Sequence, residues 1–253
     1  MSKLDRQDGA CWVILGASSA LARAFAHQVA DLGADVIVAG RDLDDLSATA
    51  ADLAIRYGVE THVLPFDAGD TDGHDAAVER ISELSRKPVS VFLAFAVMPT
   101  QDEIDADPDK AVMTTHTGYV GAVSILHRLA PVLEAQGEGR VIGIGSVAGD
   151  RGRLKNYVYG SAKAGLHTYL QGLRARLYPK NIKVTTIKPG FVDTPMTWGD
   201  KGPIPIASPD AAAAQILKVS DKNKGSAYVP GFWFFILTIV RFIPEKILWR
   251  LPI

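Results

Sequence analysis

Short apolar runs separated by longer amphipathic stretches are the feature that most constrains how this chain folds. The runs are apolar or β-branched throughout, as expected for strands that helices cover on both faces. They occupy residues 11–15, 36–39, 62–66, 89–96, 141–144 and 184–187, with a last short strand at 228–229. The stretches between them predict helices at 20–32, 43–57, 75–85, 109–136, 159–177 and 209–219. This alternation predicts a parallel, doubly wound α/β sheet with right-handed crossovers.

The length of 253 residues suits one α/β domain, and no repeat or linker divides the chain. We expect a catalytic domain over residues 1–231 and an aromatic tail over 232–253. Residues 197–207 are rich in glycine and proline and predict a long loop near the strand ends. The net charge of −1 gives no attraction to nucleic acid. The single cysteine, Cys11, and the absence of metal-ligand spacing favour a reducing, cytoplasmic compartment and no metal.

The first predicted strand runs into a turn of small residues, and a helix follows directly. The turn reads Gly16-Ala17-Ser18-Ser19-Ala20-Leu21. Small residues at a helix N-terminus let a phosphate approach backbone N–H groups, so we expect Gly16, Ser18, Ser19, Ala20 and Leu21 to contact a dinucleotide. The alternative is a structural turn that binds nothing.

Two residues at the ends of the next strands bear on which dinucleotide binds. Gly40 stands where NAD-specific folds place an acidic residue, and Arg41 follows it. Arg41 is suited to a 2′-phosphate, so NADP(H) is expected over NAD(H), unless Arg41 merely balances nearby aspartates. Asp67 follows the third strand and has two equally good roles, as acceptor for an adenine amino group or as cap of its own turn.

The strongest functional pattern combines a strand-end serine with a tyrosine–lysine pair. Ser146 ends the fifth strand, and Tyr159 and Lys163 follow on a predicted helix, four residues apart and therefore on one face. Hydride transfer to a ketone builds negative charge on its oxygen, and a phenol can supply the proton. We expect the Lys163 ammonium to lower the pKa of Tyr159, and Ser146 to hold the substrate oxygen. Tyr157 lacks a lysine four residues on.

With these residues in place, the chain resembles the short-chain dehydrogenase/reductase family over nearly its whole length. Gly16, Asp67, Ser146, the Tyr159–Lys163 pair and the segment 189–194 follow that family's order and spacing. The resemblance implies a single-domain Rossmann fold of about seven strands, assembled as a homodimer or homotetramer. It also places Lys163 at the nicotinamide ribose. The further cofactor contacts that it implies are Ala68, Ala96, Pro189, Gly190, Val192 and Thr194.

Three positions depart from the family pattern. Alanines, Ala20 and Ala22, stand where glycines are usual, and residues 94–97 read Ala-Phe-Ala-Val in place of Asn-Asn-Ala-Gly. The helix asparagine of the family's proton relay is replaced by Thr115. These changes leave open a catalytically silent binding protein on the same fold, although the complete Ser146, Tyr159 and Lys163 set argues against it.

A narrower resemblance comes from residues 147–161 and from the tail segments 228–233 and 243–245. These are similar to the decaprenylphosphoryl-2-keto-erythropentose reductase branch, which implies a keto-sugar substrate carried on a polyprenyl phosphate. The alternative is a reductase of a soluble ketone or acyl substrate. Both substrate classes are compatible with the sequence.

The tail combines aromatic and basic residues in a way typical of interfacial helices. Its apolar run at 232–240 is about half of the roughly 20 residues that a spanning helix needs, and Arg241 and Pro244 interrupt it. We therefore expect peripheral contact with the inner face of a membrane, without spanning. The alternative is a subunit interface, because an aromatic patch serves either purpose.

Overall fold

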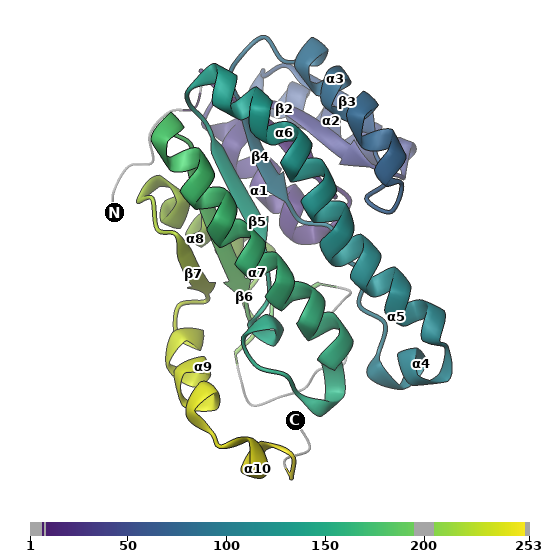
Figure 1. Cartoon of the computed structure of the whole chain (residues 1–253). Helices are drawn as coiled ribbons and strands as arrows, with labels where there is room; N and C mark the ends of the chain where they lie inside the picture. The colour runs from purple at the N-terminus through teal and green to yellow at the C-terminus, as the bar shows by residue number, and fades with distance from the viewer. Residues whose placement is uncertain (1–6, 8, 195–204, 251–253) are drawn as a thin grey trace.

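Seven parallel strands form one sheet with the order β3-β2-β1-β4-β5-β6-β7 in the computed structural model (Figure 1). The structure describes residues 7, 9–194 and 205–250. The strands are β1 Cys11–Leu15, β2 Asp35–Gly40, β3 Thr61–Pro65, β4 Val89–Leu93, β5 Arg140–Ile144, β6 Lys183–Pro189 and β7 Ser226–Val229. The predicted single-domain, doubly wound Rossmann fold of about seven strands is confirmed.

Helices cover both faces of the sheet, which is why its central strands are continuously apolar. One face carries α1 (Ala20–Asp31), α2 (Leu43–Tyr57) and α8 (Pro209–Asp221). The other carries α3 (His74–Leu84), α6 (Ala122–Gln136) and α7 (Tyr157–Leu177). The rings of Phe25 on α1 and Phe92 on β4 stack with centroids 4.0 Å apart, and Trp12 packs edge-on against Phe25. These contacts fix α1 over the middle of the sheet.

The predicted helix at 109–136 is a composite. It consists of α5 (Pro108–Thr115), one π-helical segment η2 (His116–Gly121) and then α6. Such π segments insert an extra residue into a helix and often lie at functional sites. Here the segment begins directly after Thr115, the residue that replaces the family's relay asparagine.

Two further boundaries differ from the prediction. The strand expected at 89–96 ends at Leu93, and Ala94 still donates a hydrogen bond to the Leu15 carbonyl before the chain leaves the sheet. Helix α4 (Gln101–Ala106) was not predicted, because its sequence has no apolar periodicity. A capping box between Thr100 and Glu103 stabilises its N-terminus. The loop predicted at 197–207 lies largely outside the described residues, although its last residue, Ala207, pairs with Val192.

The tail forms two short helices, α9 (Trp233–Phe242) and α10 (Glu245–Leu248), beyond the end of β7 (Figure 1). Trp233 and Leu237 are buried and form a small cluster with Val147, which follows β5. In the part of the chain that the structure describes, no helix is long and apolar enough to cross a membrane. Helix α9 thus packs against the loop that leaves the fifth strand.

Candidate active site

The predicted site residues gather at the carboxyl ends of the strands. Gly16 follows β1, Arg41 follows β2, and Ser146 follows β5. Strands β1 and β4 are neighbours although two strands separate them in sequence, so the strand order reverses between them. Ligands of open α/β sheets bind outside the carboxyl ends of the strands at such a reversal.

The turn after β1 is tight and leads directly into α1. Gly16 has φ +86°, and a Cβ at this position would lie 2.8 Å from the backbone N of Phe95, so only glycine fits. Ser19 caps α1 by accepting a hydrogen bond from the Ala22 N–H at 3.2 Å. Ala22 is completely buried, as a small residue at a close helix–sheet contact should be. The remaining turn positions are exposed Ser18, part-buried Ala20 and buried Leu21.

A pocket of about 480 Å³ opens at the ends of β2 and β3. Its lining includes Gly40, Arg41, Phe66, Asp67 and His74. Arg41 is exposed and forms no ion pair with any described residue. Asp67 accepts a hydrogen bond from the Gly69 N–H at 2.8 Å, so the turn-capping role is present, while its carboxylate still lines the pocket. The lining of this pocket thus combines the cation of Arg41 with the carboxylates of Asp67 and Asp70.

Tyr159, Ser146 and Lys163 lie together at the start of α7. Ser146 hydrogen-bonds Tyr159, and its Oγ also accepts from the Ala148 N–H at 3.1 Å. Lys163 lies one helical turn on, its Nζ 5.7 Å from the centre of the Tyr159 ring. The Nζ donates to the Ile144 carbonyl at 2.9 Å, and the side chain is only 2% exposed. The structure therefore brings together the three residues that the sequence pattern predicted to form one site.

The expected lowering of the Tyr159 pKa by Lys163 is wrong for this structure. Burial raises the pKa of Tyr159 to about 12, and the Ser146 hydrogen bond opposes this only partly. Burial also lowers the pKa of Lys163 to about 8. Desolvation disfavours the charged form of both groups. Tyr159 is thus a neutral phenol at physiological pH, the form that donates a proton.

Two residues behind Ser146 were not predicted as part of the site. His167 on α7 accepts a hydrogen bond at Nε2 from the Ser146 N–H, at 3.3 Å. Burial lowers the pKa of His167 to about 3, so the ring is neutral, and its proton lies on Nδ1, 3.7 Å from Asp150 Oδ1. Nothing in the sequence pairs these residues, because they meet only through the packing of α7 on the loop after β5.

Asp150 is the centre of a buried polar cluster that reaches the tail. Its side chain is 1% exposed and accepts from Lys188 Nζ at 2.5 Å and from the Tyr228 hydroxyl. Arg241 of α9 lies 2.9 Å from the same carboxylate. Burial would raise the pKa of Asp150, but the hydrogen bonds from Lys188 and Tyr228 hold that pKa below its usual value. The tail is therefore joined to the loop that carries Ser146.

The segment after β6 also meets the tail. A Cβ on Gly190 would lie 1.8 Å from Trp233 Nε1, so this glycine is required by the close approach of the indole. Pro189 ends β6, and Val192 is buried in a bridge with Ala207. Thr194 is part-buried and is the last residue described before the gap. The two remaining predicted contacts are Ala68, buried after β3, and Ala96, part-buried after β4.

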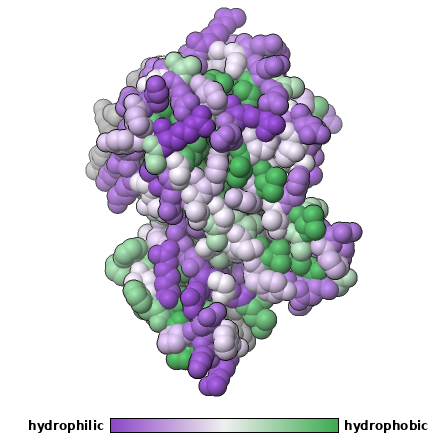
Figure 2. Space-filling view, in the orientation of Figure 1, coloured by the Kyte–Doolittle hydropathy of each residue, from purple (hydrophilic) through white to green (hydrophobic). Residues whose placement is uncertain are grey.

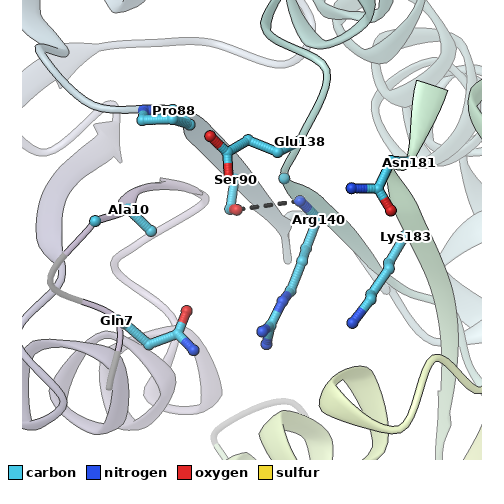
Figure 3. A pocket seen from close by; sticks show the side chains of 10 residues that line it. Gln7, Ala10, Pro88, Ser90, Glu138, Arg140, Asn181 and Lys183 are labelled. Carbon is cyan, nitrogen blue, oxygen red and sulfur yellow. Dashed lines mark hydrogen bonds between the residues drawn. The ribbon is translucent and has the colours of Figure 1, made fainter. Parts of the chain in front are cut away.

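A second pocket, of about 350 Å³, lies at the opposite edge of the sheet (Figure 3). Its lining includes Ala10, Ser90, Arg140 and Lys183, which lie at the amino ends of β1, β4, β5 and β6. The Arg140 N–H donates to Ser90 Oγ at 3.1 Å. Because Arg140 begins the strand that Ser146 follows, this pocket is remote from Ser146, Tyr159 and Lys163. Within the described ranges, no group of three or more His, Cys, Asp or Glu side chains is placed to hold a metal ion.

Comparison with known proteins agrees with this geometry. Residues 10–202 match the short chain dehydrogenase family. The chain belongs to this family and is an NAD(P)-dependent oxidoreductase. An uncharacterised oxidoreductase of Mycobacterium tuberculosis is 32% identical over 250 residues, covering 98% of this chain and 100% of that protein. A sulfoacetaldehyde reductase of Chromohalobacter salexigens is 32% identical over 74% of each chain.

Solved structures share the fold at lower identity. L-Sorbose reductase of Gluconobacter frateurii, complexed with NADPH and L-sorbose, superposes with a TM-score of 0.76 at 24% identity, over 90% of this chain and 96% of its own. A short-chain dehydrogenase of Sphingobium yanoikuyae in complex with NADPH gives 0.77 at 22% identity, over 93% and 97%. At these identities the likeness shows the fold alone.

Proposed function

We propose that this protein transfers a hydride between NADP(H) and a ketone or secondary alcohol, with Ser146, Tyr159 and Lys163 as catalytic residues. The observation that carries the proposal is that these three side chains meet at the carboxyl edge of the sheet, where the strand order reverses. A silent binding protein has no use for a buried tyrosine, lysine and serine in contact, since burying the charge of Lys163 is costly.

Each of the three residues has a distinct task in reduction. The nicotinamide, when bound, supplies the hydride to the carbonyl carbon. The Ser146 hydroxyl hydrogen-bonds the carbonyl oxygen and holds it beside Tyr159. The Tyr159 phenol gives its proton to that oxygen as negative charge develops there. The Lys163 ammonium then favours the phenolate that remains, and in oxidation the same phenolate accepts the proton back.

The residues proposed to hold the cofactor lie at the carboxyl ends of successive strands, and each group of them contacts a different part of the dinucleotide. Gly16, Ser18, Ser19, Ala20 and Leu21 offer the turn and the α1 N-terminus to the pyrophosphate. Asp67 and Ala68 border the adenine, and Ala96, Pro189, Gly190, Val192 and Thr194 border the nicotinamide half. Arg41 pairs with a 2′-phosphate, which favours NADP(H). The NADPH complexes of related structures support this preference.

For the substrate, we propose a keto-sugar linked to a polyprenyl phosphate. The support is the resemblance of residues 147–161 and of the tail, together with the aromatic surface that the tail exposes. On this proposal residues 1–231 form the catalytic domain, and 232–253 rest on the inner face of the cytoplasmic membrane. The protein then acts as a peripheral homodimer or homotetramer.

A panel of ketones with NADPH tests this substrate. Short-chain prenyl-phosphate keto-sugars, the corresponding free keto-sugars and acyl thioesters are offered to the enzyme, and NADPH oxidation is followed. We expect the highest kcat/KM for the prenyl-phosphate compounds. A higher kcat/KM for a free ketose or an acyl thioester would favour a soluble substrate. The sulfoacetaldehyde reductase relative makes sulfonated aldehydes a useful further member of the panel.

A further inference from the structure

His167 extends the face of α7 that carries Tyr159 and Lys163. The three residues are spaced four apart, so each lies about one helical turn beyond the last. The side chain of His167 is only 5% exposed and points toward the loop after β5. There its Nε2 accepts a hydrogen bond from the Ser146 N–H at 3.3 Å. One helix therefore carries both the proposed proton donor and a contact to the serine beside it.

The loop after β5 leaves space for the imidazole ring on both sides of Ser146. A Cβ on Gly145 would lie 2.2 Å from His167 Nε2, and a Cβ on Gly149 would lie 2.7 Å from His167 Cε1. The same Cβ on Gly149 would lie 2.8 Å from the backbone N of Ala164, because the loop packs directly on α7. The two glycines thus allow the ring to reach the serine backbone and hold it in close packing.

His167 provides the hydrogen bond that ties the Ser146 backbone to α7. The Ser146 carbonyl accepts from the Gly149 N–H at 3.1 Å, and its Oγ accepts from the Ala148 N–H at 3.1 Å. Both donors belong to the loop itself, so these bonds fix the shape of the loop and not its place on the helix. The bond to His167 links the serine backbone to the element that carries Tyr159.

Asp150 favours the form of the His167 ring that can accept this hydrogen bond. A neutral imidazole has one donor nitrogen and one acceptor nitrogen, and the partner of the donor decides which is which. The Asp150 carboxylate lies 3.7 Å from His167 Nδ1 and is held by hydrogen bonds from Lys188 and Tyr228. The proton on Nδ1 faces this negative charge, so the lone pair of Nε2 stays available for the Ser146 N–H.

We propose that His167 is a positioning residue, which holds Ser146 so that its hydroxyl meets the substrate oxygen beside Tyr159. This rests on the proposed reductase function and adds to it a residue that acts through Ser146. Catalysis by a positioned group depends steeply on distance, and a displacement of about 1 Å can lower the rate about a hundredfold. The loss of His167 should therefore lower kcat and leave NADPH binding in place.

Hydrogen exchange of the Ser146 amide, followed by NMR, tests the contact without any substrate. His167→Leu removes the acceptor, so exchange should become about tenfold faster, as for the loss of one hydrogen bond. His167→Gln offers an amide oxygen near the position of Nε2 and should restore the protection. Leu173→Ala, at another buried position on α7, is the control for lost stability and should leave this exchange rate within about twofold. An unchanged rate in His167→Leu would overturn the proposal.

A double-mutant cycle with Ser146→Ala tests whether His167 acts through the serine. With the most reactive ketone of the substrate panel, His167→Leu should lower kcat by about ten- to a hundredfold, while the Kd for NADPH stays within about twofold. His167→Gln should recover most of the rate, and Leu173→Ala should keep it. In the Ser146→Ala background, His167→Leu should change kcat by less than about twofold, since no hydroxyl remains to be positioned. Equal losses in both backgrounds would overturn the proposal.

The two measurements separate this inference from the proposed function. A wild-type enzyme that oxidises NADPH with no ketone of the panel would contradict the reductase. The exchange rates of the Ser146 amide would still decide whether His167 holds the serine.

Discussion

At the scale of single residues, burial rather than pairing sets the charge states of Tyr159 and Lys163, two of the proposed catalytic residues. Lys163 is enclosed beneath Ser146 and Tyr159, and its ammonium has a carbonyl, not a carboxylate, as partner. The Ser146, Tyr159 and Lys163 pattern was visible in the sequence because helix periodicity relates positions four apart. The direction of the tyrosine pKa shift was not, because desolvation depends on every neighbour in space.

Cofactor affinity should therefore depend on pH through Lys163. Its pKa of about 8 in the folded enzyme lies below its ordinary value, so the ammonium is present below that pH and is lost above it. We expect the Kd for NADPH to rise between about pH 7 and about pH 9, because a neutral amine holds the ribose less well. Fluorescence titration measures this. Lys163→Arg keeps its charge and should flatten the profile, and a flat wild-type profile would contradict the assignment.

Arg41 should set the preference for NADPH over NADH. Arg41→Asp removes the phosphate partner and adds a repelling charge, so the kcat/KM ratio of NADPH to NADH should fall by about ten- to a hundredfold or more. Arg86→Asp is the control, an exposed arginine at a distance from this pocket. A wild-type enzyme that already prefers NADH would show that Arg41 only balances the neighbouring aspartates.

At the scale of elements, the strands were predictable and the contacts between distant loops were not. Runs of apolar or β-branched residues located every strand within a few residues, because most positions of strands that helices cover on both faces are apolar or β-branched. Helix α4 was missed since six residues are too few for a helical period. His167 and Asp150 were missed because each lies near a predicted site residue in the sequence, but the two meet only through the packing of α7 on the loop after β5. Trp233 was missed because it approaches Gly190 from the tail, which is distant in the sequence.

Helix α9 should contribute measurably to stability through its buried side. Leu237 is 2% exposed in the cluster with Trp233 and Val147. Leu237→Ala should lower the free energy of unfolding by about 2–3 kcal/mol, as for a leucine in a small core. Phe235→Ala on the same helix, where the ring is 69% exposed, should change it by less than about 0.5 kcal/mol. Urea unfolding, followed by circular dichroism, measures the free energy of unfolding of each variant. Equal losses in the two variants would contradict the packing of α9 described here.

At the scale of the whole molecule, the outer side of the tail is an unusual surface. Phe234, Phe235, Ile239, Phe242, Ile247 and Trp249 are all at least half exposed. Figure 2 shows hydrophobic residues gathered at the lower left, where Figure 1 places α9 and α10. Lys246 and Arg250 lie exposed beside them. Such a mixture suits shallow burial at a lipid headgroup layer, or contact with a second subunit.

Surface substitutions distinguish a membrane from a second subunit as the partner of the tail, and they do so better than truncation. Truncation before Phe232 would also remove Trp233 and Arg241, which hold the loop after Ser146. We expect the double variant Phe235→Glu, Phe242→Glu to lose sedimentation with vesicles containing anionic lipid and to keep its oligomeric state. Ile55→Glu, an equally exposed position on α2, is the control and should keep both. If vesicle binding persists while a dimer or tetramer dissociates, the tail is a subunit interface.

The central claim is that Tyr159 donates the proton during NADPH-dependent reduction. Its most direct test compares Tyr159→Phe with Tyr157→Phe, whose hydroxyl instead donates to Asp105 on α4. With the most reactive ketone of the substrate panel, Tyr159→Phe should lower kcat by about two to four decades while the Kd for NADPH stays within a few fold. Tyr157→Phe should retain kcat within a few fold. Near wild-type turnover by Tyr159→Phe, or an equal loss in both variants, would contradict the account.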